Sequence, residues 1–306
     1  LWIGTENGIN YYSYAERRIK NMTIVADGKP VKLVQAICEV NDTTLWVATA
    51  GEGLVKIHLV GTPDSPIVAS SKRIYAGDGG PEANTFTVAY KENSNTIWFG
   101  TKGNGVYKVE SGSERMENIL FAKGENKLQN SVYSILKNGQ GYWFATGDGL
   151  ARMNGTEKVV FDDDNGFTHK AVHGILEDNS GNLWLSTSRG IVKFSMEKLT
   201  SHLCKQVEGK TIIGFSNGAC FKDPLTNMLL FGGENGLVTI NENDFVQPDY
   251  TPLINFTGLS VFGKGHSIYQ YMTSGRGKST IRLNYDQNVF GVSFVANDYI
   301  DGKDYT

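Results

Sequence analysis

The segment "NLWLSTSRGIVKFS", Asn182 to Ser195, decides how the rest of the chain is interpreted. A short apolar run with a tryptophan precedes a turn at Ser188 to Gly190, and a second alternating run follows it. Two such runs around a glycine turn are typical of a β-hairpin, because glycine supplies the backbone freedom that a tight turn needs. The segment is therefore predicted to form two antiparallel strands.

The same pattern occurs six times along the 306 residues. The copies are "LWIGTENGINYY" from Leu1, "TLWVATAGEGLVKIH" from Thr44, "TIWFGTKGNGVYKVE" from Thr96, "GYWFATGDGLARMN" from Gly141, "NLWLSTSRGIVKFS" from Asn182 and "NMLLFGGENGLVTIN" from Asn227. Their tryptophans are Trp2, Trp46, Trp98, Trp143 and Trp184, with Leu230 at that position in the last copy. Successive spacings of 44, 52, 45, 41 and 46 residues leave room for four short strands per repeat, which indicates a β-propeller or a similar radial array.

The fifth repeat illustrates the expected blade. Strands are predicted at Ala171 to Glu177, at Leu183 to Thr187 and at Ile191 to Ser195, with a weaker outer strand around Leu203 to Val207. Four antiparallel strands in a meander make one blade. The tryptophan lies on the second strand, where its large ring is expected to fill the gap between neighbouring blades as core.

The predicted fold class is all-β, a β-propeller of four-stranded antiparallel blades followed by a truncated β-sandwich. Copies two to six have the residues for whole blades and the first copy lacks an innermost strand, so about six blades are expected. A ring of six could not close without a borrowed strand. We therefore expect most of a seven-bladed ring, which begins upstream of Leu1 in a longer protein.

Two domains are predicted, with propeller blades over residues 1–247 and a linker with the beginning of an immunoglobulin-like β-sandwich over residues 248–306. The repeat stops after Phe245, two prolines follow, and an alternating strand is predicted at Ile254 to Phe262. A loop is predicted at Thr273 to Thr280. Residues Val289 to Val295 then alternate in the manner of a sandwich strand.

The composition is that of a globular chain, with 40% hydrophobic and 20% charged residues. The net charge of −3 gives no general reason to expect a nucleic acid or an anionic membrane as partner. Three cysteines, Cys38, Cys204 and Cys220, are too few for a disulfide framework. No run approaches the roughly 18 apolar residues of a membrane span, and no signal peptide is visible.

The unit "ILEDNSGNLWLSTSRGIVKF" resembles the two-component-regulator propeller repeat: a short strand, an acidic residue, a Gly turn, Leu-Trp, small-Thr and Gly-Leu/Ile. All six copies match it to varying degrees between Leu1 and Phe245, although the last copy has Leu230 and Gly233 in place of Trp and Thr. The tail, "PLINFTGLSVFGK" and "IRLNYDQNVFGVSFVANDYIDGKDYT", resembles the Tyr-rich immunoglobulin-like domain that follows such propellers. Together they resemble the periplasmic sensor region of hybrid two-component systems of gut Bacteroidetes.

That resemblance implies the periplasmic portion of an inner-membrane protein, with an upstream propeller before it and a membrane helix and kinase after it in the same chain. The family's sensor half binds oligosaccharides from complex glycans and controls polysaccharide-utilisation genes. A homodimer through the sensor region is expected, with no direct nucleic acid contact by this fragment. No catalytic activity is expected in these residues.

The chain offers no motif for chemistry of its own. His169 and His173 lie across a predicted loop-to-strand junction and do not have metal-ligand spacing on one helix, and the run Asp162 to Asp164 is expected to be a solvated turn. No cofactor and no metal ion are expected. Two alternatives stay open: a propeller-type lyase or glycosidase, whose paired carboxylates could come from different blades, and a protein-docking scaffold.

A ligand is expected at one end of the propeller, because the turns between second and third strands and the connections between blades share one face. Polar residues that differ from copy to copy are free to specify a ligand there. At the start of the first strands, one such column contains Gln35, Thr87, Tyr133 and His173. The predicted ligand-binding residues are Lys102, Gln129, Tyr133, His169, Lys170, His173 and Arg189. Tyr133 would stack on a sugar, and Lys102, Lys170 and Arg189 would bind a sulfated or uronic one.

Overall fold

The computed structural model describes residues 1–77, 80–122, 126–204, 214–241, 253–275 and 278–297. The chain divides into two compact units, Leu1–Phe245 and Val246–Thr306, and each is considered by itself. The predicted domain boundary after residue 247 falls within residues 242–252, which lie outside the described residues.

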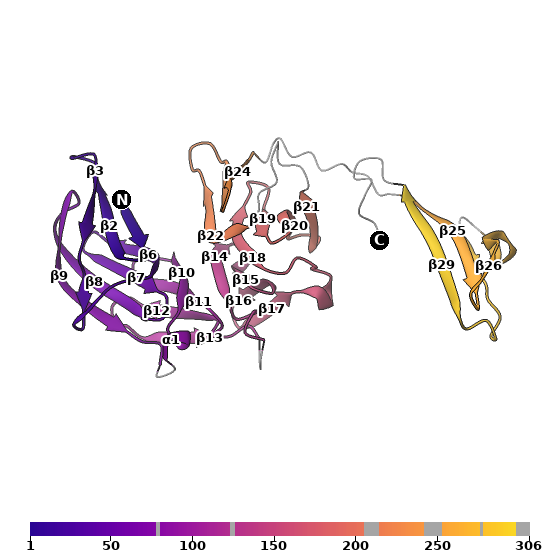
Figure 1. Ribbon diagram of the computed structural model, residues 1–306, viewed down its shortest axis with the longest axis horizontal. Helices are drawn as coiled ribbons and strands as arrows, with labels where there is room; N and C mark the ends of the chain where they lie inside the picture. The colour runs from indigo at the N-terminus through magenta and orange to yellow at the C-terminus, as the bar shows by residue number, and fades with distance from the viewer. Residues whose placement is uncertain (78–79, 123–125, 205–213, 242–252, 276–277, 298–306) are drawn as a thin grey trace. The chain divides into compact units, whose positions relative to one another are not determined.

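The described residues of the first unit form six antiparallel sheets of three or four strands, which we number 1 to 6 in chain order (Figure 1). Sheet 1 consists of β1 (Trp2–Thr5), β2 (Gly8–Ser13) and β3 (Arg18–Met22), and sheet 2 of β6 (Val34–Asn41), β7 (Thr44–Thr49), β8 (Leu54–Thr62) and β9 (Ser65–Ile74). Sheet 3 consists of β10 (Phe86–Lys91), β11 (Thr96–Thr101), β12 (Val106–Glu110) and β13 (Met116–Ile119), and sheet 4 of β14 (Val132–Asn138), β15 (Gly141–Thr146), β16 (Gly149–Asn154) and β17 (Glu157–Phe161). Sheet 5 consists of β18 (Val172–Glu177), β19 (Asn182–Thr187), β20 (Gly190–Ser195) and β21 (Thr200–Cys204), and sheet 6 of β22 (Phe215–Lys222), β23 (Leu229–Gly233) and β24 (Gly236–Ile240). A small hairpin of β4 (Val25–Ala26) and β5 (Lys29–Pro30) lies in the chain between sheets 1 and 2.

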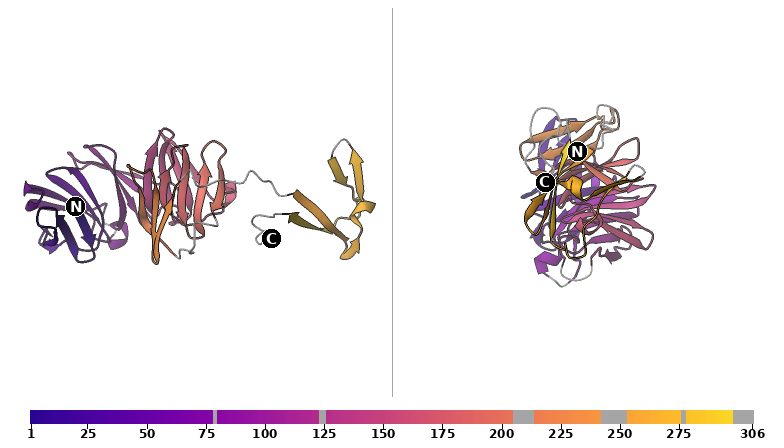
Figure 2. Two further views of the ribbon diagram at one scale, coloured as in Figure 1. Left: turned by 90° about the horizontal axis from the view of Figure 1, so that it is seen from above. Right: turned by 90° about the vertical axis from the view of Figure 1, so that its right-hand side faces the viewer.

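The sheets are meanders that pack against one another in chain order, as Figures 1 and 2 show by colour. The first strands contact each other along the series β6, β10, β14, β18 and β22, and β22 also contacts β10 and β14. The all-β prediction of propeller-like, four-stranded blades is therefore confirmed, while closure of a seven-bladed ring stays a prediction.

The tryptophans form the predicted core between sheets. Trp46 packs with Phe86 and Phe99 of sheet 3, and Trp184 packs with Phe231 of sheet 6. In sheets 2 to 5 each of these rings lies opposite a cation on the third strand, at 5.2 to 5.7 Å from the ring centre. The pairs are Trp46 with Lys56, Trp98 with Lys108, Trp143 with Arg152 and Trp184 with Lys193. Burial of the ring and cation–π attraction both favour this arrangement.

Two details of sheets 5 and 6 differ from the sequence analysis. The outer strand of sheet 5 begins at Thr200, earlier than the predicted Leu203, because pairing with β20 starts directly after the turn at Ser195 and Thr200. Its predicted end at Val207 lies outside the described residues. Sheet 6 has three strands among the described residues, and the stretch after Ile240 that would supply a fourth includes residues 242–252.

The second unit contains a three-stranded antiparallel sheet of β26 (Lys264–His266), β25 (Leu253–Val261) and β29 (Phe290–Asn297), in that order. The two strands predicted around Ile254 and Val289 therefore exist, and they pair with each other. The prediction of a loop at Thr273 to Thr280 is wrong, because β27 (Met272–Gly275) and β28 (Lys278–Ile281) pair with each other there.

Helices are rare and short: α1 (Gly80–Ala83), η1 (Asp163–Asn165) and η2 (Ile268–Gln270). Among the described residues, no helix has the length and apolar character needed to cross a membrane.

Candidate ligand-binding site

The first strands of sheets 2 to 5 share a β-bulge at the same position. The register with the second strand shifts between Val34 and Ala36, between Phe86 and Val88, between Val132 and Ser134, and between Val172 and Gly174. The residues inside these four shifts are Gln35, Thr87, Tyr133 and His173. A bulge leaves one residue unpaired and redirects its side chain, which is why bulges are frequent next to binding sites. The predicted column of variable residues is thus a column of bulge residues.

Sheet 6 has a longer irregularity in the same place. The register of β22 shifts between Phe215 and Cys220, so that Asn217 and Gly218 lie within the interruption. Gly218 has a φ of 71°, and a side chain there would approach the backbone oxygen of Tyr133 at 3.1 Å. The interrupted part of β22 therefore reaches across to β14, and only glycine fits that conformation and that approach easily.

Tyr133, His173 and Asn217 come together at this position, and we name them the bulge cluster. The rings of Tyr133 and His173 are 6.1 Å apart between centroids and nearly parallel, with an interplanar angle of 16°. Nδ1 of His173 lies 2.7 Å from Oδ1 of Asn217, so the imidazole donates from Nδ1 to the amide oxygen. Tyr133 and His173 are half-buried and Asn217 is exposed. The cluster joins sheets 4, 5 and 6 and faces solvent.

Close packing supports the cluster from beneath. A Cβ at Gly174 would lie 3.0 Å from Cβ of Cys220 and from Oγ of Ser186, so β18 and β22 approach each other closely one residue after His173. At the side, a Cβ at Gly147 would lie 3.3 Å from the hydroxyl oxygen of Tyr133. The absence of a side chain at Gly147 and Gly174 therefore permits close packing around Tyr133 and beside His173.

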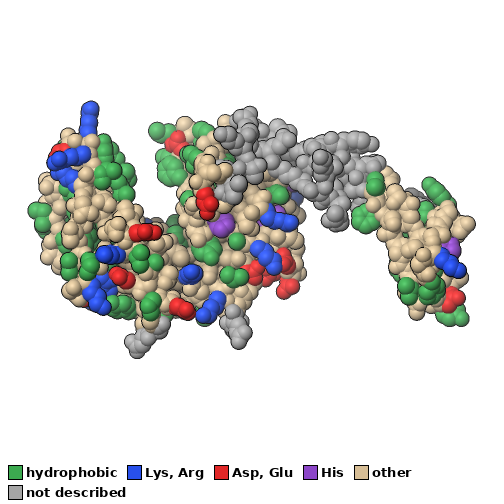
Figure 3. Space-filling model, viewed as in Figure 1, with side chains coloured by type: hydrophobic (Ala, Val, Ile, Leu, Met, Phe, Trp, Pro, Cys, Tyr) green, Lys and Arg blue, Asp and Glu red, His purple; other side chains and the backbone are tan. Residues whose placement is uncertain are grey.

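Two of the predicted residues are already held by acidic groups in the connection between sheets 4 and 5. Lys170 forms an ion pair with Asp163 at 2.9 Å, and this contact, together with Asp148, raises the pKa of Lys170. Gln129 donates from Nε2 to Asp162 at 2.9 Å. Asp162 also caps the short helix η1, so the acidic run is a hydrogen-bonded turn. Figure 3 shows acidic side chains gathered beside β17, whose end this connection continues.

His169 differs from a solvated loop residue, because only 7% of it is exposed. Its ring packs edge-on against Phe167 at 5.3 Å, and among the described residues its Nδ1 has no hydrogen-bond partner. Burial lowers the pKa of His169, and the charge of Arg189 lowers it further. Arg189 is therefore close enough to act on the charge of His169, and the imidazole itself is buried.

Lys102 is exposed in the turn between β11 and β12 of sheet 3. Its backbone N–H donates to the carbonyl of Thr85 at 3.0 Å, which ties that turn to the start of β10. The structure thus brings Tyr133 and His173 into one cluster, and brings Gln129 and Lys170 together through the acidic turn. Asn217 was missed, although the "SNG" interruption inside an otherwise apolar strand is a sequence signal for a bulge.

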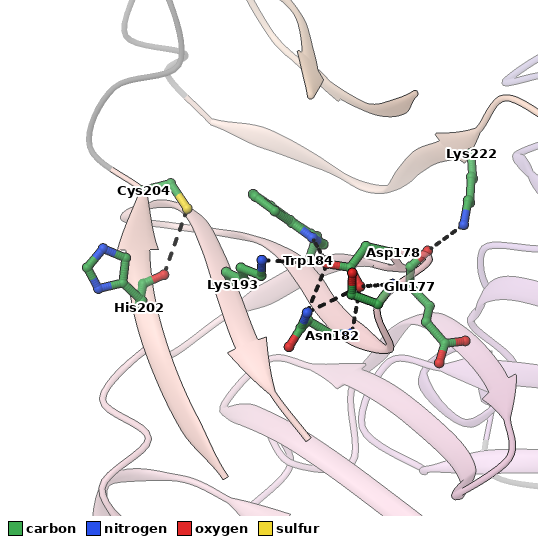
Figure 4. A network of polar contacts seen from close by, with 9 residues as sticks. Glu177, Asp178, Asn182, Trp184, Lys193, His202, Cys204 and Lys222 are labelled. Carbon is green, nitrogen blue, oxygen red and sulfur yellow. Dashed lines mark hydrogen bonds and ion pairs between the residues drawn. The ribbon is translucent and has the colours of Figure 1, made fainter. Parts of the chain in front are cut away.

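The opposite end of β18 is a second polar network, drawn in Figure 4. The carboxylate of the buried Asp178 accepts hydrogen bonds from Nε1 of Trp184 at 2.9 Å and from the backbone N–H of Asn182 at 2.7 Å, and Lys193 lies 3.7 Å away. Burial raises the pKa of Asp178, but the hydrogen bonds and Lys193 outweigh it, so the pKa lies below its usual value. Glu92 and Asn138 accept from Trp98 and Trp143 in the same way. A carboxylate this well satisfied is a structural element of the repeat.

The described residues contain no group of three His, Cys, Asp or Glu side chains that could hold a metal ion. Burial raises the pKa of the Cys38 thiol to about 11 and that of Cys204 to about 12, and it also raises the pKa of Cys220. Thiols with raised pKa values are poor nucleophiles at neutral pH. The bulge cluster itself offers hydrogen-bonding groups and an aromatic surface.

Comparison with known proteins supports the propeller-like fold. Residues 166–189 match the family of two component regulator propellers, and that stretch includes both ends of β18. The histidine kinase P4 of Formosa agariphila is 20% identical over 319 residues, which cover 99% of this chain and 23% of the kinase. The chain therefore spans less than a quarter of that relative.

Solved structures with a similar fold include extracellular domains of hybrid two component systems from B. thetaiotaomicron. For BT3049 the TM-score is 0.65 at 20% identity, covering 96% of this chain and 39% of the other. For BT4673 it is 0.60 at 20% identity, covering 87% of this chain and 35% of the other. YCF48 bound to D1 peptide gives a TM-score of 0.54 at 13% identity, covering 78% and 73%. The predicted resemblance to two-component-regulator propellers and to such extracellular domains is confirmed.

Proposed function

We propose that this chain is the ligand-sensing part of the extracytoplasmic region of a hybrid histidine kinase and response regulator. In this proposal it binds oligosaccharides from complex glycans in the periplasm, and it signals across the inner membrane to control polysaccharide-utilisation genes. The observation that carries the proposal is the family match at residues 166–189, because the matched stretch includes His173 of the bulge cluster.

The chemistry of the bulge cluster supports a sugar ligand. Sugars are bound by planar hydrogen-bonding side chains together with an aromatic ring, in a site that is largely formed beforehand. Tyr133 supplies a ring, and His173 and Asn217 supply an imidazole and an amide that are joined by a hydrogen bond. Held by neighbouring backbone at Gly147 and Gly174, these groups would lose little freedom on binding.

Signalling requires two states that the ligand distinguishes, because a ligand with equal affinity for both shifts nothing. The propeller and the sandwich-like unit that follows it would form a homodimer whose geometry depends on the ligand. The membrane helix and the kinase of the parent chain would then read that geometry. Crosslinked dimers that look identical with and without ligand would contradict this part of the proposal.

The test is a binding screen of the complete extracytoplasmic region of the parent chain. Thermal shift and calorimetry against a panel of glycan oligosaccharides would identify a ligand, and chromatography of each mixture would show whether it is altered. We expect a stabilising oligosaccharide that is recovered unchanged. Alanine variants at Tyr133, His169 and Arg189 would then map the site.

The alternatives give different results in the same screen. Cleavage of the oligosaccharide would indicate a lyase or a glycosidase and would overturn the sensor proposal. If no oligosaccharide of the panel binds, the result would favour a protein-docking scaffold. YCF48, which has a similar fold, is solved with a peptide bound, so a docking role is a real competitor.

A further inference from the structure

The arrangement of the bulge cluster limits where a ligand can lie. Each van der Waals contact between a ring and a sugar needs about 3.5–4 Å, so a sugar held between two rings needs roughly 7 Å or more. The rings of Tyr133 and His173 are only 6.1 Å apart. A sugar therefore lies against an outer face or edge of the pair, where Asn217 is exposed, and does not enter between the rings.

None of the groups that the cluster presents is a carboxylate, an ammonium or a guanidinium. They are a phenol, an amide and an imidazole that donates from Nδ1. Among the described residues the hydroxyl of Tyr133 has no hydrogen-bond partner, so it can both donate to and accept from a sugar hydroxyl. This set matches hydroxyl groups, which also both donate and accept.

The charges around the cluster disfavour an anion. The described turns at 147–148, 188–189 and 234–235 and the connection 162–171 carry the carboxylates Asp148, Asp162, Asp163, Asp164 and Glu234, against the cations Lys170 and Arg189. Lys170 is already paired with Asp163, and Asp148 also acts on it. A carboxylate or sulfate on the ligand would compete with Asp163 for Lys170, and it would meet Asp148, which follows Gly147 beside the hydroxyl of Tyr133.

We propose that the bulge cluster of Tyr133, His173 and Asn217 binds an uncharged sugar residue and that it rejects uronic and sulfated sugars. This inference rests on the proposed sensor function and specifies its ligand class. It favours a neutral glycan over the sulfated or uronic one for which Lys102, Lys170 and Arg189 would supply charge-assisted bonds.

The test uses calorimetry on the complete extracytoplasmic region with named probes. Xylotetraose, mannotetraose and β-1,4-galactotetraose are the neutral probes, and tetragalacturonate and a heparin tetrasaccharide are the anionic ones. Each is titrated at about 50 mM and at about 500 mM sodium chloride, because salt weakens charge–charge binding and leaves neutral binding nearly unchanged. We expect a neutral probe to bind with affinities that agree within about two-fold at the two salt concentrations.

Variants assign the binding to the cluster. Tyr133→Ala and Asn217→Ala are each expected to lower the affinity by about ten-fold, and Tyr133→Phe, which keeps the ring, by less. Tyr14→Ala is the matched control, since Tyr14 is 68% exposed in the turn after β2 and lies outside the cluster. Thermal unfolding of every variant shows whether an affinity change accompanies loss of the fold.

Each outcome has one meaning. Binding of an anionic probe that weakens at high salt overturns the inference and leaves the sensor proposal standing. The same holds if a neutral probe binds equally well to Tyr133→Ala and Asn217→Ala. Failure of every probe to bind the unaltered protein overturns the sensor proposal, and the inference with it.

Discussion

The two ends of strand β18 carry polar groups in opposite states. At its far end Asp178 is buried, accepts several hydrogen bonds and lies near Lys193. At its start His173 is half-buried, and its partners in the bulge cluster reach solvent. Both ends are polar and both lie in the matched stretch 166–189, yet the hydrogen bonds of Asp178 are saturated and those of the bulge cluster are not. In a repeat, saturated hydrogen bonds mark a structural residue, and unused hydrogen-bonding groups mark the candidates for ligand binding that the proposal names.

The largest effect on stability is expected at the structural end of β18, where Trp184 donates to Asp178. Trp184 is fully buried between sheets 5 and 6, so Trp184→Ala is expected to lower the free energy of unfolding by about 3–5 kcal/mol. Urea unfolding followed by circular dichroism measures this. Trp2 is only half-buried in sheet 1, and Trp2→Ala should cost about half as much. An equal loss of unfolding free energy in the two variants would contradict the assignment of the buried tryptophans of sheets 2 to 5 as the main core.

The next largest loss of stability is expected from removing the carboxylate of Asp178, which is the hydrogen-bond acceptor. Asp178→Ala leaves the indole N–H of Trp184 and the backbone N–H of Asn182 without an acceptor in a buried place, at a cost of about 2–3 kcal/mol near pH 7. The turn residue Asp223 is the control, and Asp223→Ala should cost less, because its carboxylate accepts from turn groups near solvent and not from a buried tryptophan.

The stabilisation by Asp178 should also depend on pH. Its pKa in the folded protein is below the ordinary value of 3.8, so the unfolded chain takes up the proton first as the pH falls. The contribution is complete above the ordinary value and is lost as the pH falls below 3.8 towards the folded pKa. The gap in stability between the unaltered protein and Asp178→Asn should therefore narrow in acid. A gap that stays constant would show that the carboxylate charge contributes nothing.

The blade could be predicted from the sequence because its causes are local and repeated. Alternation, the Gly turn and the Trp spacing all recur about every 41 to 52 residues, and β19 and β20 form where they predict. The cation opposite each ring follows from register alone, since Trp184 and Lys193 are directly paired. The hairpin β27–β28 was missed because its residues are too polar to show a clear alternation.

The candidate site could be predicted only in part, because its contacts join residues of different repeats. Tyr133 and His173 were found as members of one column, since equal positions in successive blades are neighbours in space. Asn217 is 44 residues from His173 and sits in an interruption unlike that of the other first strands, so column counting does not reach it. The pairing of Lys170 with Asp163 and the burial of His169 depend on the path of a connection, which no periodicity encodes.

A smaller effect is expected at His169, which is buried like Asp178 but has a nitrogen without a hydrogen-bond partner among the described residues. Burial and Arg189 lower its pKa in the folded protein below the ordinary 6.5, so the unfolded chain binds the proton first. The folded protein should lose stability as the pH falls below 6.5, and His169→Gln should lack that part of the loss. Thermal unfolding between about pH 7.5 and about pH 5.5 measures the difference. His58 is exposed, so His58→Gln should keep the pH dependence of the unaltered protein, and an equal slope for both variants would refute the prediction.

The smallest expected effect sharpens the comparison most, because it shifts a group of the bulge cluster and leaves the three cluster residues unmutated. A Cβ at Gly147 would lie 3.0 Å from the backbone oxygen of Leu128 and 3.3 Å from the hydroxyl of Tyr133, so Gly147→Ala must displace one of them. We expect a stability cost of about 1 kcal/mol and an affinity for the bound oligosaccharide lowered by about three-fold. Calorimetry with Gly139→Ala as control measures it, since a side chain at Gly139 meets no atom within 4 Å. Unchanged affinity in Gly147→Ala, with its fold intact, would mean that the position of Tyr133 does not determine binding, and the binding end of β18 would then resemble the structural one.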